Sequence, residues 1–244
     1  MIGERFIELL RVDSTNNYAM QQLQTGVAKH GDAYFAFEQT AGRGQMQKQW
    51  FSANGENIIL SVILNATALQ LHLQFALNMI AALSVIELFN NYTTEKFKIK
   101  WPNDIYLGDR KAAGILIENI IRGKSWQFAV AGFGVNINQT AFPDTLKNPV
   151  SLKQVTGATH DPVAMAKELC ALLEKNLEPL YRNDAGNAVH DYNKILYKKD
   201  EPASFKHNGR LFTGIVKSVT RDGKLVVLDG IEKTFLSGEI EWVL

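Results

Sequence analysis

The chain has 244 residues, enough for one large domain or for one domain with a small appendage. Its formal net charge of +1 gives no whole-chain case for binding nucleic acid or a membrane surface. The single cysteine, Cys170, excludes an internal disulfide and lies in a helical apolar pattern that indicates a buried structural thiol. Because the first residues contain neither an apolar core segment nor a cleavage site, we expect a cytoplasmic protein.

The first two thirds of the chain mix helical and strand patterns. Residues 13–16 offer several N-caps for a helix that includes residues 18–23. Adjacent strand patterns joined by short turns predict a largely antiparallel or mixed sheet with packed helices, and not strict βαβ alternation. The predicted strands are residues 33–38, 57–64, 97–101, 105–107, 111–121 and 126–136, the last two forming a hairpin.

Residues 69–89 form the longest apolar stretch of the chain. Gln70, His72 and Glu87 interrupt this stretch, whereas a membrane span of the same length is nearly free of such groups. The apolar residues recur at helical spacing on two adjacent stripes. We therefore expect a helix buried in the protein core.

The pattern changes near residue 198, after helical segments with an interruption near Gly186. Short strand patterns then alternate with Asn-Gly, Asp-Gly and Ser-Gly turns, which indicates a small β-barrel or sandwich. We predict two domains, residues 1–197 and 198–244. The strand patterns of the second domain are residues 203–206, 210–219, 224–229, 233–235 and 240–243.

The most informative segment is 100–116, with the sequence Lys-Trp-Pro-Asn-Asp-Ile-Tyr-Leu-Gly-Asp-Arg-Lys-Ala-Ala-Gly-Ile-Leu. Asn103 and Asp104 follow a rigid Trp-Pro corner, and Lys111 stands at the start of a buried strand. A fixed cation beside a carboxylate and an amide suits an anionic reactant, with or without a metal ion. For Lys111 alone, an exposed lysine at a strand end is the simpler interpretation.

Two further segments bear on chemistry. In residues 38–50, Gly42 and Gly44 flank Arg43, which allows close backbone approach and supplies a planar donor fork for phosphate or carboxylate. In residues 131–138, small residues would let a flat ligand lie against a strand within reach of Asn136. Each has a simpler alternative, a surface turn for the first and tight strand packing for the second.

Taken together, these segments resemble biotin protein ligases over nearly the whole chain. Ser14-Thr15-Asn16, residues 39–44, 100–114 and 132–136 occur in the order and rough spacing of that family, with Gly238-Glu239-Ile240 near the end. The most specific motif is Lys-Trp-Pro-Asn-Asp followed by Arg-Lys-x-x-Gly-Ile-Leu. The resemblance implies an α+β fold like that of class II aminoacyl-tRNA synthetases, with a mixed central sheet, and a small C-terminal SH3-like β-barrel.

The resemblance also implies a reaction. Such enzymes condense biotin with Mg-ATP to biotinyl-5′-AMP and pass biotin to a lysine of a biotin carboxyl carrier domain of a carboxylase. The first step brings a carboxylate onto an α-phosphate, so charge repulsion is the main obstacle. Lys111 and Arg43 are the catalytic cations that the resemblance implies, and Mg²⁺ adds further charge.

The family motifs assign ligand contacts to this chain. Trp50 is open between an adenine-stacking wall and ordinary core, and Trp101 is interpreted as packing. Asp104 is the implied magnesium ligand. The implied biotin contacts are Ser14, Thr15, Asn16, Gln39, Gly42, Arg43, Gly44, Gln45, Lys111, Gly114 and Gly132, and the implied ATP contacts are Arg43, Trp50, Asn103, Asp104, Lys111 and Asn136.

The glycine-rich loop departs from the family pattern Gly-Arg-Gly-Arg-x-Gly-x-x-Trp. Gln45 stands where an arginine is frequent, and Gln47 stands where a glycine helps the loop fold. A charge-assisted bond to the adenylate is worth ~1.5–3 kcal/mol. We therefore expect this chain to retain its adenylate less tightly than relatives with two arginines, unless Lys48 compensates.

Several alternatives remain at the level of sequence. The chain starts about a dozen residues before Ser14, without room for the DNA-binding domain of repressing relatives, so we expect a monofunctional ligase with no DNA or membrane partner. Monomer and homodimer both stay open. The functional alternatives are a lipoate or octanoate ligase or transferase of the same superfamily, and a non-catalytic biotin-binding sensor, against which Arg43 and Lys111 argue.

Overall fold

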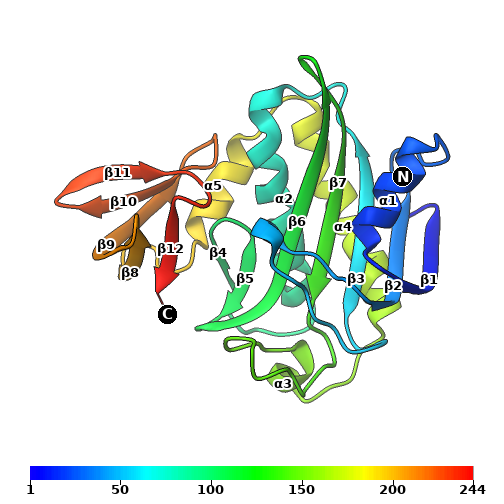
Figure 1. Cartoon of the computed structure of the whole chain (residues 1–244), viewed down its shortest axis with the longest axis horizontal. Helices are drawn as coiled ribbons and strands as arrows, with labels where there is room; N and C mark the ends of the chain where they lie inside the picture. The colour runs from blue at the N-terminus through cyan, green and yellow to red at the C-terminus, as the bar shows by residue number, and fades with distance from the viewer. Residues whose placement is uncertain (244) are drawn as a thin grey trace.

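The computed structural model describes residues 1–243 and builds the first two thirds of the chain around a seven-stranded sheet (Figure 1). The strand order is β1-β2-β3-β7-β6-β5-β4, with β1 and β2 parallel and all other neighbours antiparallel. The predicted mixed sheet is therefore confirmed. Its strands are β1 (Phe6–Val12), β2 (Ala33–Gln39), β3 (Ile58–Asn65), β4 (Lys98–Lys100), β5 (Asp104–Leu107), β6 (Arg110–Arg122) and β7 (Ser125–Val135).

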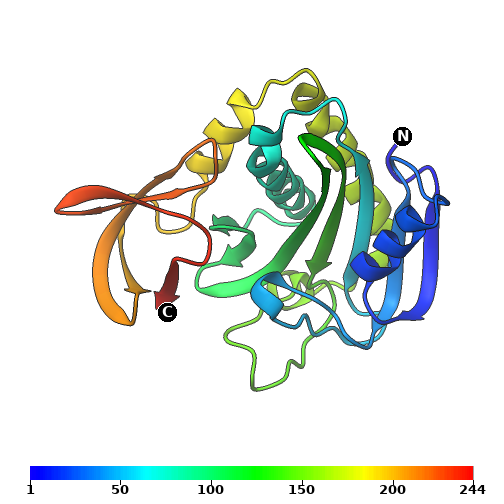
Figure 2. The ribbon, with the colours of Figure 1, turned by 45° about the horizontal axis from the view of Figure 1, so that its top comes forward.

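Helices cover both faces of this sheet. Because side chains alternate along a strand, Phe35 of β2 joins the core that includes α2 and α4, whereas Tyr34 packs with Ala19 of α1 on the other face. Figure 2 shows the strands between α1 and these two helices. The helices are α1 (Thr15–Gln24), α2 (Gln74–Asn90), α3 (Leu152–Thr156), α4 (Pro162–Tyr181) and α5 (Gly186–Lys194), with short 3-10 turns η1 (Gln45–Gln47) and η2 (Leu71–Leu73).

A second sheet of five strands follows α5, with the order β11-β10-β9-β8-β12 and antiparallel neighbours throughout. It matches the series of short strands predicted after residue 198. The SH3-like barrel shape and the domain boundary at residue 198 stay predictions. Its strands are β8 (Pro202–His207), β9 (Arg210–Val219), β10 (Leu225–Asp229), β11 (Ile231–Phe235) and β12 (Ile240–Val243).

Two indole hydrogen bonds join the sheets. Trp101 Nε1 donates to the carbonyl oxygen of Gly223 at 2.9 Å, and Trp242 Nε1 donates to the carbonyl oxygen of Trp101 at 3.2 Å. Trp101 is buried, so its interpretation as a packing residue agrees with the structure. The joint fixes β12 beside the segment that carries Asn103 and Asp104.

The predicted core helix is confirmed as α2. The stretch Leu71–Asn90 is the one helical stretch within residues 1–243 that is long and apolar enough to cross a membrane, and most of it is buried inside the protein. Cys170 lies buried in α4, where burial raises the pKa of its thiol to about 12. Helix α2 and the Cys170 side chain therefore both belong to the packed interior of the protein.

Some elements were not expected from sequence patterns. Strand β1 is a sheet edge with three of its seven residues exposed and none buried, so it lacks a clear apolar alternation. Helix α3 has five residues, too few for a periodic signal. The interruption predicted near Gly186 is confirmed, because α4 ends at Tyr181 and α5 begins at Gly186.

Candidate active site

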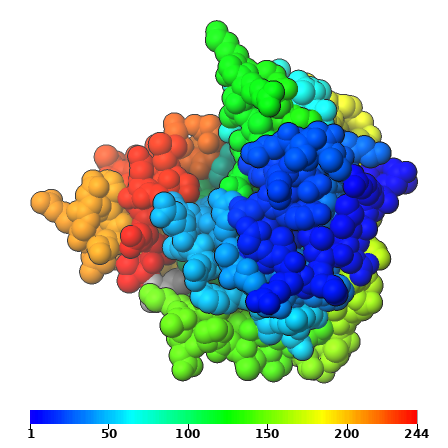
Figure 3. Space-filling model, turned by 45° about the vertical axis from the view of Figure 1, so that its right-hand side comes forward, coloured from blue at the N-terminus to red at the C-terminus, as the bar shows by residue number. Residues whose placement is uncertain are grey.

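A cavity of about 770 Å³ opens on the α1 side of the large sheet. Its walls are the glycine-rich loop, the loop before α3 and the Ser237–Trp242 segment of the second sheet. Figure 3 shows the glycine-rich loop beside the C-terminal sheet. Gly42 is the one predicted site residue that does not line the cavity. The others do: Ser14, Thr15, Asn16, Gln39, Arg43, Gly44, Gln45, Trp50, Asn103, Asp104, Lys111, Gly114, Gly132 and Asn136.

At one end of the cavity, the first turn of α1 is tied into hydrogen bonds with β2 and β3. Gln39 Oε1 accepts from the Thr15 amide at 2.8 Å, and the Ser61 hydroxyl donates to Asn16 Oδ1 at 2.6 Å. Ser14 is the N-cap of α1 by position, but its side chain makes no capping hydrogen bond. These side chains are held in place before any ligand arrives.

Gly132 on β7 lies directly beneath this end. A Cβ atom at Gly132 would overlap the side-chain amide of Asn16. The space that the sequence assigned to a flat ligand above residue 132 is therefore filled by Asn16. Glycine is needed here for close approach of a side chain.

Trp50 fills the equivalent space two residues further along β7. Its indole lies over Gly134, where a Cβ would overlap it, and within 3.0 Å of the Cβ position of Gly114. The indole nitrogen is buried and has no hydrogen-bond partner among the described residues. Trp50 thus forms part of the pocket floor and not of the hydrophobic core, which leaves it available as a stacking surface.

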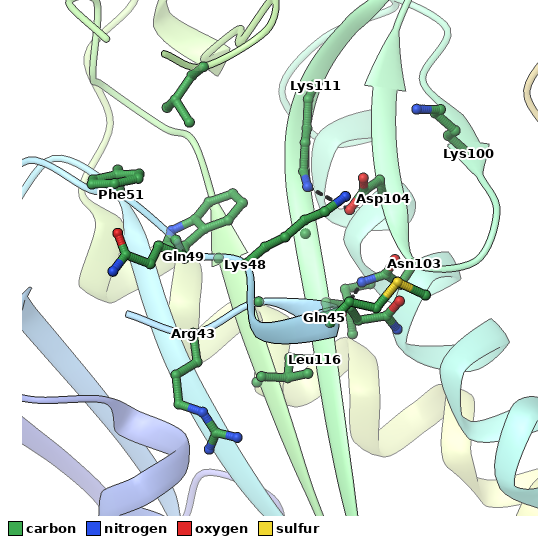
Figure 4. A pocket seen from close by; sticks show the side chains of 18 of the residues that line it. Arg43, Gln45, Lys48, Gln49, Phe51, Lys100, Asn103, Asp104, Lys111 and Leu116 are labelled. Carbon is green, nitrogen blue, oxygen red and sulfur yellow. Dashed lines mark hydrogen bonds and ion pairs between the residues drawn. The ribbon is translucent and has the colours of Figure 1, made fainter. Parts of the chain in front are cut away.

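The predicted pairing of Lys111 and Asp104 is present as an ion pair. Lys111 Nζ lies 2.7 Å from Asp104 Oδ1, and both side chains are partly exposed to the cavity. Asp104 is opposite Gly114 and Lys111 is opposite Tyr106 in the antiparallel pairing of β5 and β6, and the Lys111 side chain reaches Asp104 past Gly114, whose Cβ position lies 3.3 Å from Nζ. Figure 4 shows the two side chains pointing toward each other.

Asn103 and Asn136 flank this pair and are committed to backbone groups. Asn103 Nδ2 donates to the carbonyl oxygen of Ile115, and Asn136 Nδ2 donates to the carbonyl oxygen of Val150 at 3.1 Å. Both side chains are buried. They hold β6 and the loop before α3 in place, so the Nδ2 donors of both amides are occupied by backbone carbonyls.

Arg43 lies differently from its predicted place beside the reacting groups. Its guanidinium points away from Lys111 (Figure 4) and binds Glu118, with Nη2 at 2.7 Å from Oε1 and Nη1 at 3.1 Å from Oε2. Nη1 also donates to Asn17 Oδ1 at 2.7 Å. The structure brings Lys111 and Asp104 together but not Arg43 with them.

The rest of the glycine-rich loop forms a small hairpin. Gly44 N donates to the carbonyl oxygen of Lys48 at 2.7 Å, and Trp50 N donates to that of Gly42 at 2.9 Å. Met46 and Gln47 have left-handed backbone conformations, with φ of 53° and 60°. A glycine would relieve this strain, so the loss of a glycine at position 47 has a local cost. The Met46 side chain reaches Gly238 of the second sheet.

Lysines gather at the end of the cavity beside β12. Lys100 packs over the ring of Tyr106, with Nζ 4.8 Å from the centroid, and lies 5.6 Å from that of Trp242. Burial, together with the positive charge of neighbouring lysines, lowers the pKa of Lys100 to about 8. The Lys48 side chain extends toward Asp104 (Figure 4), and Lys147 lines the same end.

Comparisons with known proteins agree with this architecture. Residues 9–136 match the model of the biotin/lipoate A/B protein ligase family. The chain belongs to this family. It is 30% identical over 239 residues to the bifunctional ligase/repressor BirA of Escherichia coli, covering 94% of this chain and 71% of that protein.

Two other members give the same picture. A biotin--[acetyl-CoA-carboxylase] ligase of Paracoccus denitrificans is 34% identical over 161 residues, covering 63% of this chain and 65% of that protein. A biotin protein ligase from Aquifex aeolicus, solved in complex with biotin and ATP, superposes with a TM-score of 0.82 at 25% identity, covering 98% of this chain and 99% of that chain. The family fold thus extends through the second sheet.

Three residues that shape the pocket of this family member were not predicted from sequence patterns. Lys100 belongs to the Lys-Trp-Pro-Asn-Asp motif, and the motif could have singled it out. Ser61 lies in an apolar strand, where one polar residue is the only available signal. Glu118 gives no signal, since its importance depends on Arg43, 75 positions away.

Proposed function

We propose that the chain is a biotin protein ligase, which activates biotin with ATP and transfers it to a lysine of a carrier domain. The observation that carries this proposal is the Lys111–Asp104 pair at the mouth of a pocket whose other end is an ordered set of hydroxyls and amides. The first group suits a carboxylate and a phosphate, and the second suits a ureido ring. The named relatives support the same assignment.

The first step forms a bond between a biotin carboxylate oxygen and the α-phosphorus of ATP, and pyrophosphate leaves. Both reactants are anions, so a cation between them lowers the barrier. Unit charges 4 Å apart interact by ~4 kcal/mol at an effective dielectric of 20, roughly three orders of magnitude in rate. Lys111 is the cation placed for this task.

In the second step the acceptor lysine nitrogen attacks the acyl carbon of the adenylate. The new amide bond forms, AMP leaves with the electron pair of the broken C–O bond, and the amine gives up its proton. No nucleophile of the enzyme is needed, and Cys170 is buried away from the pocket. The acceptor that we propose is a biotin carboxyl carrier domain, in line with the names of the relatives.

Magnesium enters the proposal as a companion of ATP. Within residues 1–243, no group of three or more His, Cys, Asp or Glu side chains is placed to hold a metal. Mg²⁺ is commonly held by one or two carboxylates together with substrate phosphates. Asp104 fits that pattern as the single protein carboxylate, and the bound ion would supply charge to the phosphates.

A second member of the superfamily, a lipoate or octanoate ligase, would share the fold. The curated relatives are named for biotin, which favours biotin as the substrate. A non-catalytic sensor would not need the Lys111–Asp104 pair. We therefore retain biotin ligation as the proposed activity.

Biotin-dependent ATP–pyrophosphate exchange tests this proposal most directly. The expected result is exchange with biotin and none with lipoate or octanoate. Transfer of labelled biotin to a purified carrier domain then tests the second step. Absence of exchange with biotin would overturn the assignment.

A further inference from the structure

The carboxylate of Glu118, on β6, is the meeting point of two pocket segments that lie far apart in the sequence. It accepts two hydrogen bonds from Arg43 of the glycine-rich loop, at 2.7 and 3.1 Å. It also accepts from Asn16 Nδ2 of α1 at 2.8 Å. The position of Glu118 therefore bears on both segments at once.

Two acceptors decide which way the Asn16 amide faces: the Glu118 carboxylate at 2.8 Å and, more distantly, the carbonyl oxygen of Leu116 at 3.3 Å. An ionised carboxylate can only accept hydrogen bonds, so the amide nitrogen of Asn16 must point toward it. The amide oxygen then faces Ser61, whose hydroxyl lies 2.6 Å away. Asn16 has no freedom to exchange the two ends while Glu118 keeps its charge.

The orientation passes to the next side chains. The Ser61 hydroxyl also lies 2.7 Å from Thr15 Oγ1, and Gln39 Oε1 accepts from the Thr15 hydroxyl at 3.2 Å and from the Thr15 amide at 2.8 Å. Gln39 Oε1 is thereby occupied by the first turn of α1. Its Nε2 atom remains on the side of Gly42 as a donor for the cavity that Gln39 lines.

We propose that Glu118 is a positioning residue for biotin. Its carboxylate sets the donor and acceptor pattern of the chain Asn16–Ser61–Thr15–Gln39 and anchors Arg43 beside it. This inference rests on the proposed function. A ureido group offers one carbonyl acceptor and two N–H donors, so a reversed amide in the chain meets it with the wrong partner.

The decisive variant is Glu118→Gln, which keeps the shape of the side chain but adds an N–H₂ donor and removes the charge. We expect biotin to bind about tenfold more weakly, with a matching rise in the KM for biotin. The KM for ATP is expected to stay within about twofold, because Glu118 lies at the end of the pocket away from Lys111 and Asp104. Calorimetry with biotin alone measures the first effect without turnover.

A matched control is Glu87→Gln on α2. Glu87 likewise accepts from a cation and an amide, Lys175 at 2.7 Å and Asn176 at 3.0 Å, but neither partner lines the cavity, whereas Arg43 and Asn16 do. Its substitution should leave biotin binding unchanged. Both glutamine variants should show similar, small shifts in melting temperature.

The variant Arg43→Gln separates the two contacts, because it breaks the loop anchor but leaves Glu118 bound to Asn16. It should weaken biotin binding less than Glu118→Gln does. Equal losses in the two variants, unchanged biotin affinity in Glu118→Gln, or equal losses of biotin and ATP would each overturn the inference. Failure of the wild-type chain to bind biotin would instead overturn the proposed function.

Discussion

The two ends of the pocket differ in how they are built. The end beside α1 consists of hydroxyls and amides that already satisfy one another, such as Ser61 with Asn16. The other end gathers lysines, namely Lys48, Lys100, Lys111 and Lys147, with Asp104 and Glu241 as the carboxylates of the lining. The first end offers neutral hydrogen-bonding groups, and the second attracts negative charge.

Of the changes to the lysine-rich end of the pocket, removal of Lys111 should reduce activity most. Lys111→Ala takes away the cation between the two anionic reactants and leaves Asp104 without its partner. We expect exchange activity to fall by roughly three orders of magnitude. The control is Lys175→Ala, which breaks an ion pair of the same 2.7 Å length away from the pocket. Normal exchange by Lys111→Ala would refute the role given to this lysine.

The loop residue Gln45 tests whether the positive end is weaker than in relatives. Gln45→Arg adds a cation at a position that lines the cavity. The adenylate should then leave more slowly, by about 10- to 150-fold for a charged bond worth ~1.5–3 kcal/mol. The dissociation of labelled biotinyl-5′-AMP from the protein, followed over time, measures this rate. The control is Gln47→Arg, at an exposed position of the same loop; faster or unchanged release from Gln45→Arg would contradict the expectation.

Substitution of Gly134, which lies beneath the Trp50 indole, tests whether this side of the pocket binds ATP and not biotin. In Gly134→Ala the new methyl group overlaps the indole, and such overpacking costs ~1–3 kcal/mol. The KM for ATP should rise by roughly 5- to 150-fold while biotin affinity changes little. At Gly186 an added Cβ meets only ordinary contact, so Gly186→Ala serves as the control. If Gly134→Ala lost affinity for biotin but kept its KM for ATP, Trp50 would contact biotin and not the nucleotide, contrary to the prediction.

The smallest effect that we expect concerns pH. Burial lowers the pKa of Lys100 to about 8, so its charge is present below pH 8 and is lost as the pH rises above that value. The KM for ATP should therefore increase by about threefold between pH 7 and pH 9. This size corresponds to the loss of one positive charge whose attraction for ATP is partly screened by solvent. Lys100→Arg keeps its charge and should remove this pH dependence. A pH profile that persists in Lys100→Arg would assign it to another group.

The sequence predicted the strands of the sheet interior well, because β3, β6 and β7 carry long apolar runs. It missed β1, whose edge position leaves none of its side chains fully buried and removes the periodic signal. Among the site residues, Lys111 and Asp104 were predictable as neighbours because a short turn joins their strands. Local geometry of this kind can be read from a sequence.

The direction of the Arg43 side chain could not be read in the same way. It depends on Glu118, which becomes a neighbour only after β6 takes its place in the sheet. The small residues of β7 were correctly noted as an open surface, but Asn16 and Trp50 fill the space above them. Such contacts depend on tertiary packing, which spacing along the chain does not encode.

The reciprocal bonds between Trp101, Gly223 and Trp242 constrain how this enzyme can evolve. Trp101 sits inside the most recognisable motif of the chain, yet its indole and its carbonyl are both satisfied by the second sheet. A C-terminal segment transplanted from a relative must therefore place a backbone carbonyl where that of Gly223 lies and an indole donor where that of Trp242 lies. The two segments are expected to change together and not as exchangeable modules.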